Sequence, residues 1–465
     1  MPQSSTETQT VRRIHYITPP PPPIQDVPIQ IAPTRIATVQ QPLVQTPTIP
    51  QTPTSPRDIL DQEVRLNFGQ DSRSAWTLDD AIAATLAADP VLRIGQAEIS
   101  MARAELTTSS LIPNPTLEIA GNSIPFRRES EMETEFTIQA EMPLDWFLFA
   151  KRAAEMNSAR WEVRHSQAEY ADLVRQRITE TAIEFFDVLE AKALLAVAQQ
   201  DLEFLTRIEQ VTQRAVEAGG IPPLELDIVR LELFRSRQEL LKAESELNIA
   251  KAMLWAQFGR TDRDPNFTVR GNLGAPLTPV PFSVEEAFRL AQENRPDIRA
   301  LRFQVSKAQA DRVVERRNAF PEVSMFGGYI NEHLETGREP GWGIGLSVTV
   351  PLFDRNQGGR AGAQAALARS SQELRMGMID LRAEVEEADQ LLRTAYRKAS
   401  SLAEEELRLA TRVRDSIIRS YEIGGRPLIE VLDAERAVRE TYQLYISSRA
   451  DYWRAMYIYN SVIGR

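Results

Sequence analysis

The stretch "GLSVTVPLFDRNQGG", residues 345–359, contains two patterns that meet at one proline. Before Pro351, apolar residues alternate with glycine, serine or threonine from Trp342 to Val350, which is the two-residue period of a β-strand with two different faces. Proline has no N–H to donate to a strand ladder, so we expect the strand to end there. The next proline is Pro427, and we expect a long helix to begin directly after the strand.

The sequence also repeats one unit. The tetrad "TLDD" at 77–80 corresponds to "SVEE" at 283–286, and both resemble the capping boxes that begin helices. Pro90 and Pro296 follow these tetrads and lie 206 positions apart (296 − 90). Two further landmarks recur at nearly the same separation, the "PL" dipeptides at 143 and 351 and the "GG" dipeptides at 219 and 424. The shared offset indicates that the chain is a duplication of one unit of about 200 residues.

Each copy is expected to contain a helix, two strands, a long helix, a double-glycine break and a second long helix. Residues 151–218 contain neither glycine nor proline, so an uninterrupted helix there would be about 100 Å long. The corresponding stretch, 363–423, contains only Gly377. Apolar residues in both stretches step by three and four, which predicts coiled-coil-like packing along one face: Ile178, Ala182, Phe185 and Leu189, and Val385, Ala388, Leu392 and Ala395.

These patterns predict a mainly α protein with a small β part. We place the first copy at 58–270, with strands at about 115–124 and 134–142, and the second copy at 271–465, with strands at about 322–330 and 342–350. The helical hairpins are expected to turn near 219–221 and 424–426. Residues 1–57 hold 13 of the 29 prolines and little apolar periodicity, so we expect a disordered N-terminal arm.

Composition excludes several classes of function. A net charge of −11 without a basic run argues against nucleic-acid binding. Because the chain has no cysteine, we expect no disulfide, no thiolate metal site and no lipidated cysteine anchor. His15, His165 and His333 lie far apart with no ligand-spaced companion, so we expect each to be an ordinary surface residue rather than a metal ligand. No catalytic or nucleotide-binding motif appears, so we expect no enzyme activity, no catalytic residues and no cofactor.

The four expected strands have the length and alternation of transmembrane β-strands, although short alternating strands usually form half-buried sheets in soluble proteins. No apolar run is long enough for a membrane-spanning helix. Four strands cannot close a barrel, so a membrane sheet would require several chains, and three chains would supply twelve strands.

At this point the sequence resembles the TolC-type outer-membrane efflux channels, and within them the heavy-metal, cobalt–zinc–cadmium-like subunits of RND efflux systems. The resemblance covers about residues 74–465 and rests on four stretches: "LIPNPTLEI" at 111–119, "FAKRAAEMNSAR" after Pro143, "VPLFDRNQGG" at 350–359 and "YEIGGRPLIEVLDAER" at 421–436. It implies a homotrimer with a twelve-stranded transmembrane β-barrel and a periplasmic α-helical barrel. It also implies a periplasmic adaptor protein and an inner-membrane RND-type pump as partners, and contact with outer-membrane lipid.

The resemblance further implies an outer-membrane location in a Gram-negative-type bacterium, with a large periplasmic part. Exported proteins begin with a signal peptide, but residues 1–23 show no apolar core of one. We therefore expect either that the natural precursor starts elsewhere or that the signal has been removed.

The double-glycine breaks are first of all helix-hairpin turns, because glycine readily adopts positive φ. The resemblance implies that these tips contact the adaptor through Gly219, Gly220, Ile221, Gly424, Gly425 and Arg426. Glu430 and Asp433 are three residues apart, on one face of a helix. Such pairs are usually solvated surface charges, but the resemblance implies that they ring the channel entrance, with Asp227 as a weaker counterpart in the first copy.

Two readings of function follow from these observations. The first is a passive exit duct for metal cations or small toxic compounds. The alternative is a soluble periplasmic coiled-coil scaffold without channel activity, whose strands form a small sheet. The metal assignment rests on the resemblance alone, because the ten methionines are scattered and form no recognisable relay.

Overall fold

A computed structural model describes residues 68, 74–122, 135–262, 264–334, 337–422 and 425–465, all within the compact unit Thr54–Arg465. The expected N-terminal arm at 1–57 lies outside the described residues, as do residues 58–67 of the first copy. The boundary between the two copies at 270 and 271 stays a prediction.

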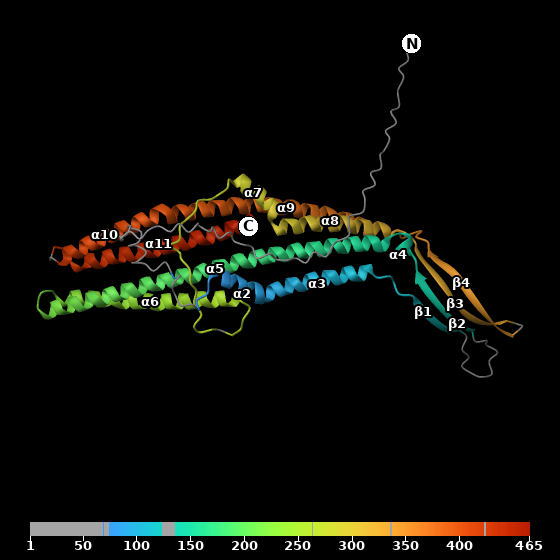
Figure 1. The fold of residues 1–465 in the computed structure, drawn as a ribbon, viewed down its shortest axis with the longest axis horizontal. Helices are drawn as coiled ribbons and strands as arrows, with labels where there is room; N and C mark the ends of the chain where they lie inside the picture. The colour runs from blue at the N-terminus through green and yellow to red at the C-terminus, as the bar shows by residue number, and fades with distance from the viewer. Residues whose placement is uncertain (1–67, 69–73, 123–134, 263, 335–336, 423–424) are drawn as a thin grey trace, which may run out of the picture. The chain divides into compact units, whose positions relative to one another are not determined.

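The two halves of the chain repeat one order of elements (Figure 1). The first half contains α2 (Leu78–Ala88), α3 (Pro90–Ser110), β1 (Thr116–Asn122), β2 (Glu135–Pro143), the one-turn helix α4 (Asp145–Leu148), α5 (Lys151–Glu217) and α6 (Pro223–Gln257). The second contains α7 (Val284–Asn294), α8 (Pro296–Arg317), β3 (Glu322–Leu334), β4 (Gly337–Thr349), α9 (Gln357–Arg397), the π-helix η1 (Lys398–Leu402), α10 (Ala403–Glu422) and α11 (Leu428–Val462). The mainly α fold built from a duplicated unit is therefore confirmed.

Local sequence explains how the short helices begin. The Thr77 hydroxyl accepts from the Asp80 backbone N–H at 3.2 Å, and the Asp80 carboxylate accepts from the Thr77 N–H at 3.0 Å. Ser283 and Glu286 form the same pair of bonds before α7, at 3.3 and 3.1 Å. Both predicted capping boxes are present, and each satisfies two backbone donors that a helix start would otherwise leave free.

The long helix α5 has 67 residues, as the absence of glycine and proline predicted. The corresponding stretch of the second copy is not one continuous α-helix, because η1 separates α9 from α10. A π-turn adds a residue to one helical turn without requiring glycine or proline, so no residue in the sequence signals it. Gly377 lies within α9, where a Cβ atom would come within 2.5 Å of Leu301 on α8.

The expected helical stripes form the core. Phe185 and Leu189 of α5 are buried with residues of α6 and α11, and Val385 and Leu392 of α9 are buried with residues of α7 and α11. Gly271 lies against this core, because a Cβ atom there would be 2.7 Å from Leu189. The hydrophobic effect thus holds α5 and α9 against neighbouring helices along one face.

The strands form one antiparallel sheet in the order β1-β2-β3-β4. Its register pairs the expected apolar positions across neighbouring strands: Leu117 with Ala140, Ile119 with Ile138, Met142 with Met325, Tyr329 with Trp342 and Leu346 with Met325. Side chains of paired residues lie on the same face of a sheet. This face is largely exposed, and Trp342 and Ile344 retain 85% and 82% of their accessible surface.

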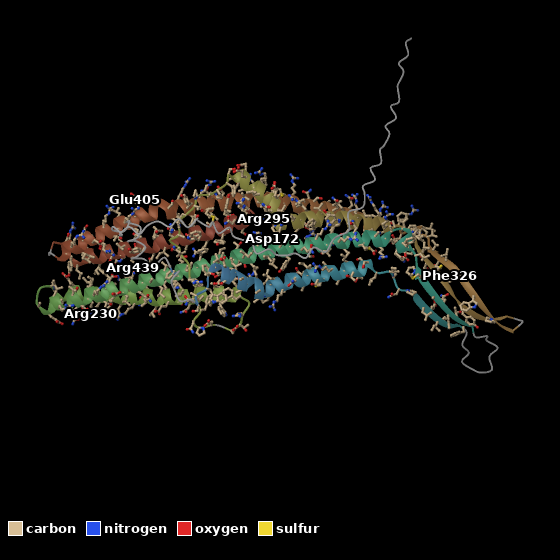
Figure 2. The ribbon with its side chains drawn as sticks, viewed as in Figure 1. Asp172, Arg230, Arg295, Phe326, Glu405 and Arg439 are labelled. Carbon is tan, nitrogen blue, oxygen red and sulfur yellow. The ribbon has the colours of Figure 1, made fainter. Side chains whose placement is uncertain are left out.

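The opposite face of the sheet is polar. Gln139 Nε2 donates to Glu118 Oε2 at 2.6 Å, and the Ser324 hydroxyl donates to Glu141. Phe326 also lies on this face, where its ring covers Gly345 (Figure 2). The sheet therefore has one apolar and one mostly polar side, as the two-residue period predicted.

The strand-to-helix junctions repeat an uncommon backbone conformation. Ala150 directly precedes α5 and Asn356 directly precedes α9, and their φ angles are 54° and 53°. Positive φ is costly for residues other than glycine. The chain therefore changes direction sharply at the same point of both copies. No helix in the described part combines the length and hydropathy needed to cross a membrane.

We expect Gly328→Ala to weaken the pairing of β2 with β3, whereas Gly327→Ala should be tolerated. A Cβ atom at Gly328 would lie 2.3 Å from the Ile138 carbonyl oxygen, but the nearest atom to one at Gly327 is 3.6 Å away. Overpacking of this kind typically costs about 1–3 kcal/mol. Hydrogen–deuterium exchange of peptides from β2 and β3 measures the effect, and equal protection in the two variants would contradict the register.

Candidate functional site

The first hairpin turns through a glycine-dependent helix end. Gly219 has φ of 74° and its N–H donates to the Val216 carbonyl at 2.9 Å, while the Gly220 N–H donates to the Ala215 carbonyl at 2.9 Å. These two bonds define a Schellman motif, which requires a left-handed residue after the helix. Gly219 and Gly220 are exposed and Ile221 is half-buried. The tip therefore presents mainly backbone to its surroundings.

The second tip is similar where it is described. The Gly425 N–H donates to the Ser420 carbonyl, five residues earlier, at 2.8 Å, as Gly220 does in the first tip. Gly425 and Arg426 are exposed, whereas Gly424 lies outside the described residues. The two tips thus share the bond that closes a Schellman motif.

Each predicted entrance carboxylate of α11 forms an ion pair. Glu430 Oε2 accepts from Arg426 Nη1 at 2.7 Å, and Asp433 Oδ1 accepts from Arg436 Nη1 at 3.1 Å. Asp227 is exposed on α6, in the second turn after the first tip. The structure records no ion pair for Asp227 within the described residues. The start of α11 thus carries two carboxylates, each paired with a neighbouring arginine.

The two hairpins of one chain contact each other just behind the tips. Apolar side chains of α5, α6 and α11 form one buried cluster there: Leu205, Val229, Leu233, Leu428 and Leu432. Two arginines of α11 extend the contact with charged bonds. Arg436 Nη2 donates to Glu232 Oε1 at 3.0 Å, and Arg439 Nη1 donates to both carboxylate oxygens of Asp201 at 3.1 Å. Figure 2 shows Arg439 on the second hairpin, facing the first.

The sequence analysis missed these contacts, and also Glu435. This carboxylate lies on the buried side of α11, 9% exposed, and its Oε2 is 3.8 Å from Arg414 Nη1. Oε2 has no hydrogen-bond partner among the described residues. Burial raises the pKa of Glu435 to about 7, with the neighbouring Asp201 adding to this effect and Arg414 opposing it.

A signal for Glu435 does exist in the sequence. Leu428, Val431, Leu432 and Val438 form an apolar stripe with helical spacing, and Glu435 occupies the next position of that stripe. A charged residue within an apolar stripe is either buried or near a partner. The partner of Arg439 carries no such signal, because Asp201 is 238 residues away in the chain.

The described residues hold no group of histidine, cysteine, aspartate and glutamate side chains that could bind a metal ion. The charged groups near the tips instead act in pairs across helices. Their geometry can hold two hairpins together and present charge at the tips.

Comparison with known proteins agrees with this architecture. The family model described as "Outer membrane efflux protein" matches residues 81–260 and 287–456. The cobalt-zinc-cadmium resistance protein CzcC of Cupriavidus metallidurans is 27% identical over 401 residues, which cover 86% of this chain and 92% of that protein. The nickel-cobalt-cadmium resistance protein NccC of Alcaligenes xylosoxydans xylosoxydans is 22% identical over 287 residues, covering 61% and 62%.

Solved structures share the fold. The crystal structure of CusC aligns with a TM-score of 0.71 at 18% identity, covering 90% of this chain and 99% of that one. The Campylobacter jejuni CmeC outer membrane channel aligns with a TM-score of 0.71 at 15% identity, covering 90% and 94%. Because the family model matches one segment in each copy of the duplicated unit, together more than half of the chain, the protein belongs to the outer membrane efflux protein family.

Proposed function

We propose that the chain is the outer-membrane channel subunit of a tripartite efflux system, working as a homotrimer and a passive exit duct. An inner-membrane RND-type pump delivers the substrate through a periplasmic adaptor protein. Membership of the outer membrane efflux protein family supports the general role. The observation that carries the proposal is the apolar face of the sheet, which is exposed along most of the strands.

Water is a poor environment for such a face. Trp342, Ile344 and Leu346 of β4 are exposed, as are Leu117 and Ile119 of β1 at the other edge of the sheet. In lipid, these side chains are stable, but unpaired edge strands are not, because no water satisfies their backbone groups. Three chains that pair β1 of one with β4 of the next would close a twelve-stranded barrel and remove every edge.

The soluble scaffold is the less favourable reading. It requires the small sheet to bury its apolar side against protein, yet this side is the exposed one in the described residues. A contiguous exposed apolar surface of this kind marks a membrane or protein interface.

We propose that the tips at Gly219, Gly220 and Ile221, and at Gly424, Gly425 and Arg426, contact the adaptor. Exposed backbone at Gly219, Gly220 and Gly425 supports this role, because adaptor side chains can approach glycine closely. Glu430, Asp433 and Asp227 would line the entrance behind them. Three chains would bring these carboxylates together, where they favour cations over anions.

Metal cations are the proposed substrate class. Two relatives support this choice by name, the cobalt-zinc-cadmium resistance protein and the nickel-cobalt-cadmium resistance protein. Acidic groups near the tips agree with a cationic substrate, although small toxic compounds remain the second candidate.

The membrane role predicts that Leu346→Lys prevents insertion whereas Ser347→Lys does not. Leu346 lies on the apolar face, where a lysine in the hydrocarbon costs about 2–4 kcal/mol at mid-depth and less near the interface. The neighbouring Ser347 lies on the polar face, opposite Ser324. Outer-membrane fractionation and native mass spectrometry measure insertion and trimer yield. Wild-type protein in the soluble fraction would refute the channel, and equal tolerance of both lysines would refute the lipid-facing side.

The entrance role predicts that Glu430→Ala with Asp433→Ala raises conductance in planar bilayers and weakens block by divalent cations. The change also frees Arg426 and Arg436 from their carboxylate partners, so the cation preference should fall. Glu239→Ala with Glu246→Ala is the matched control, because it removes two exposed carboxylates of α6 away from the tip. Wild-type conductance and block in the first variant would mean that the entrance lies elsewhere.

The hairpin contact predicts a pH-dependent stability. The pKa of Glu435 in the folded protein, about 7, is above its ordinary value of 4.5, so the folded state retains a proton that the unfolded state has lost. The free energy of unfolding should therefore fall as pH rises from about 4.5 to 7, by at most about 3 kcal/mol. Glu435→Gln should lack this loss.

Denaturant unfolding of the detergent-solubilised protein at pH 5 and pH 8 tests this expectation. Glu440→Gln, which changes an exposed carboxylate on the same helix, is the matched control. If the free energy of unfolding depends on pH in the same way for wild type and Glu435→Gln, then ionisation of Glu435 does not destabilise the folded state.

A further inference from the structure

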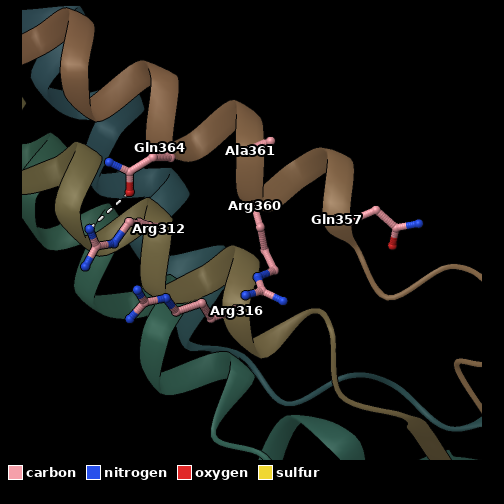
Figure 3. A pocket seen from close by; sticks show the side chains of 6 residues that line it. All are labelled: Arg312, Arg316, Gln357, Arg360, Ala361 and Gln364. Carbon is pink, nitrogen blue, oxygen red and sulfur yellow. Dashed lines mark hydrogen bonds between the residues drawn. The ribbon is translucent and has the colours of Figure 1, made fainter.

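A basic pocket lies between α8 and α9, next to the strands and at the opposite end of the helices from the tips. Its volume is about 420 Å³, and it is lined by Arg312, Arg316, Gln357, Arg360, Ala361 and Gln364. Figure 3 shows Arg360 extending from α9 toward α8, where Arg312 and Arg316 lie one helical turn apart. Three guanidinium groups from two helices therefore line one small space.

No carboxylate of the described chain pairs with these three arginines. Arg312 Nη1 donates to the amide oxygen of Gln364 at 3.2 Å, and its buried Nε has no hydrogen-bond partner in the described part. Glu315 lies between the two α8 arginines in sequence, but its carboxylate accepts from Asn356 Nδ2 at 2.6 Å. The Glu315 charge therefore offsets only part of the charge of the three guanidinium groups, and the remaining positive charge attracts an external anion.

Exposed apolar side chains lie at both strand-to-helix junctions. Phe147 and Leu148 of α4 and Leu352 and Phe353 before α9 are all exposed, Phe353 at 92%. Gln357, which lines the pocket, donates from Nε2 to the Phe353 carbonyl at 3.2 Å. Aromatic side chains at the end of membrane-spanning strands lie at the level of the lipid headgroups. The pocket is therefore within one to two helical turns of that level.

We propose that this pocket binds the phosphate group of an anionic phospholipid in the membrane leaflet on the helical side. The proposal rests on the proposed membrane role of the strands. The arginines supply the planar, multiple donors that phosphate oxygens accept, and the side chains of Leu352 and Phe353 supply apolar contacts for the acyl chains. A free phosphate ion would use the arginines but not the apolar residues, so the two sources of phosphate are separable.

The test titrates full-length protein, solubilised in a non-ionic detergent, with phosphatidylglycerol, phosphatidylcholine or inorganic phosphate, and counts bound molecules by native mass spectrometry. We expect phosphatidylglycerol to bind about tenfold or more tightly than phosphatidylcholine, because only the first carries net negative charge. Excess inorganic phosphate should not displace it.

The triple variant Arg312→Gln, Arg316→Gln, Arg360→Gln should lose this preference. The matched control, Arg237→Gln with Arg375→Gln and Arg412→Gln, removes three exposed arginines that lie outside the pocket and should keep it. If the triple variant does not fold, Arg360→Gln alone replaces it in the test, because this change affects one exposed side chain at the start of α9. We expect Arg360→Gln to reduce the preference for phosphatidylglycerol.

Three results would overturn the proposal. Equal affinity for the two lipids, or an unchanged preference in the pocket variants, would show that the arginines do not bind headgroups. Displacement of phosphatidylglycerol by inorganic phosphate would make free phosphate the ligand. Membrane fractionation and bilayer conductance of the same wild-type preparation are the separate test of the channel, so a conducting protein without lipid preference refutes the pocket alone.

Discussion

The structure depends on a four-stranded sheet whose apolar side is exposed and whose outer strands, β1 and β4, have no partner within the described chain. Both strand pairs lead into and out of helices at one end, and the helices leave the apolar side of the sheet exposed. The apolar side chains and the edge N–H and C=O groups both need partners that one copy does not supply. In the proposed membrane role, lipid contacts the apolar side chains and neighbouring chains pair with the edge strands, so the sheet accounts for both the assembly and the location.

The helices meet a different constraint. A helix of 67 residues exposes more surface than a compact core can cover, so α5 is buried in short stretches against different neighbours along its length. Alanine, serine and threonine are frequent among its buried residues, which allows close helix approach without a thick apolar layer. Charged residues between these stretches then find partners on adjacent helices, as Arg454 of α11 does with Asp187 of α5 at 2.6 Å.

Local sequence patterns predicted most of the fold. The capping boxes at Thr77 and Ser283, the two-residue period of the strands and the absence of glycine in α5 each act over a few residues, so they are readable without a structure. The π-turn η1 and the bond between Arg439 and Asp201 are not, because each depends on how distant helices pack. The turns at both glycine pairs could also be predicted, whereas one sequence does not identify the residues of another protein that contact these turns.

The strands of the sheet and the two hairpins at the tips differ in how easily they separate from their neighbours. At the strand end, backbone hydrogen bonds hold the sheet, and hydrocarbon offers no other partner for these N–H and C=O groups. At the tip end, an apolar cluster with five buried side chains and two arginine–carboxylate contacts hold the hairpins together. The cost of desolvating Arg439, Asp201 and Glu232 offsets much of their electrostatic attraction, so these pairs contribute little net stability, and the buried Glu435 carboxylate opposes the contact once it is ionised. A conformational change of the channel should therefore begin at the hairpin contact, while the sheet remains intact.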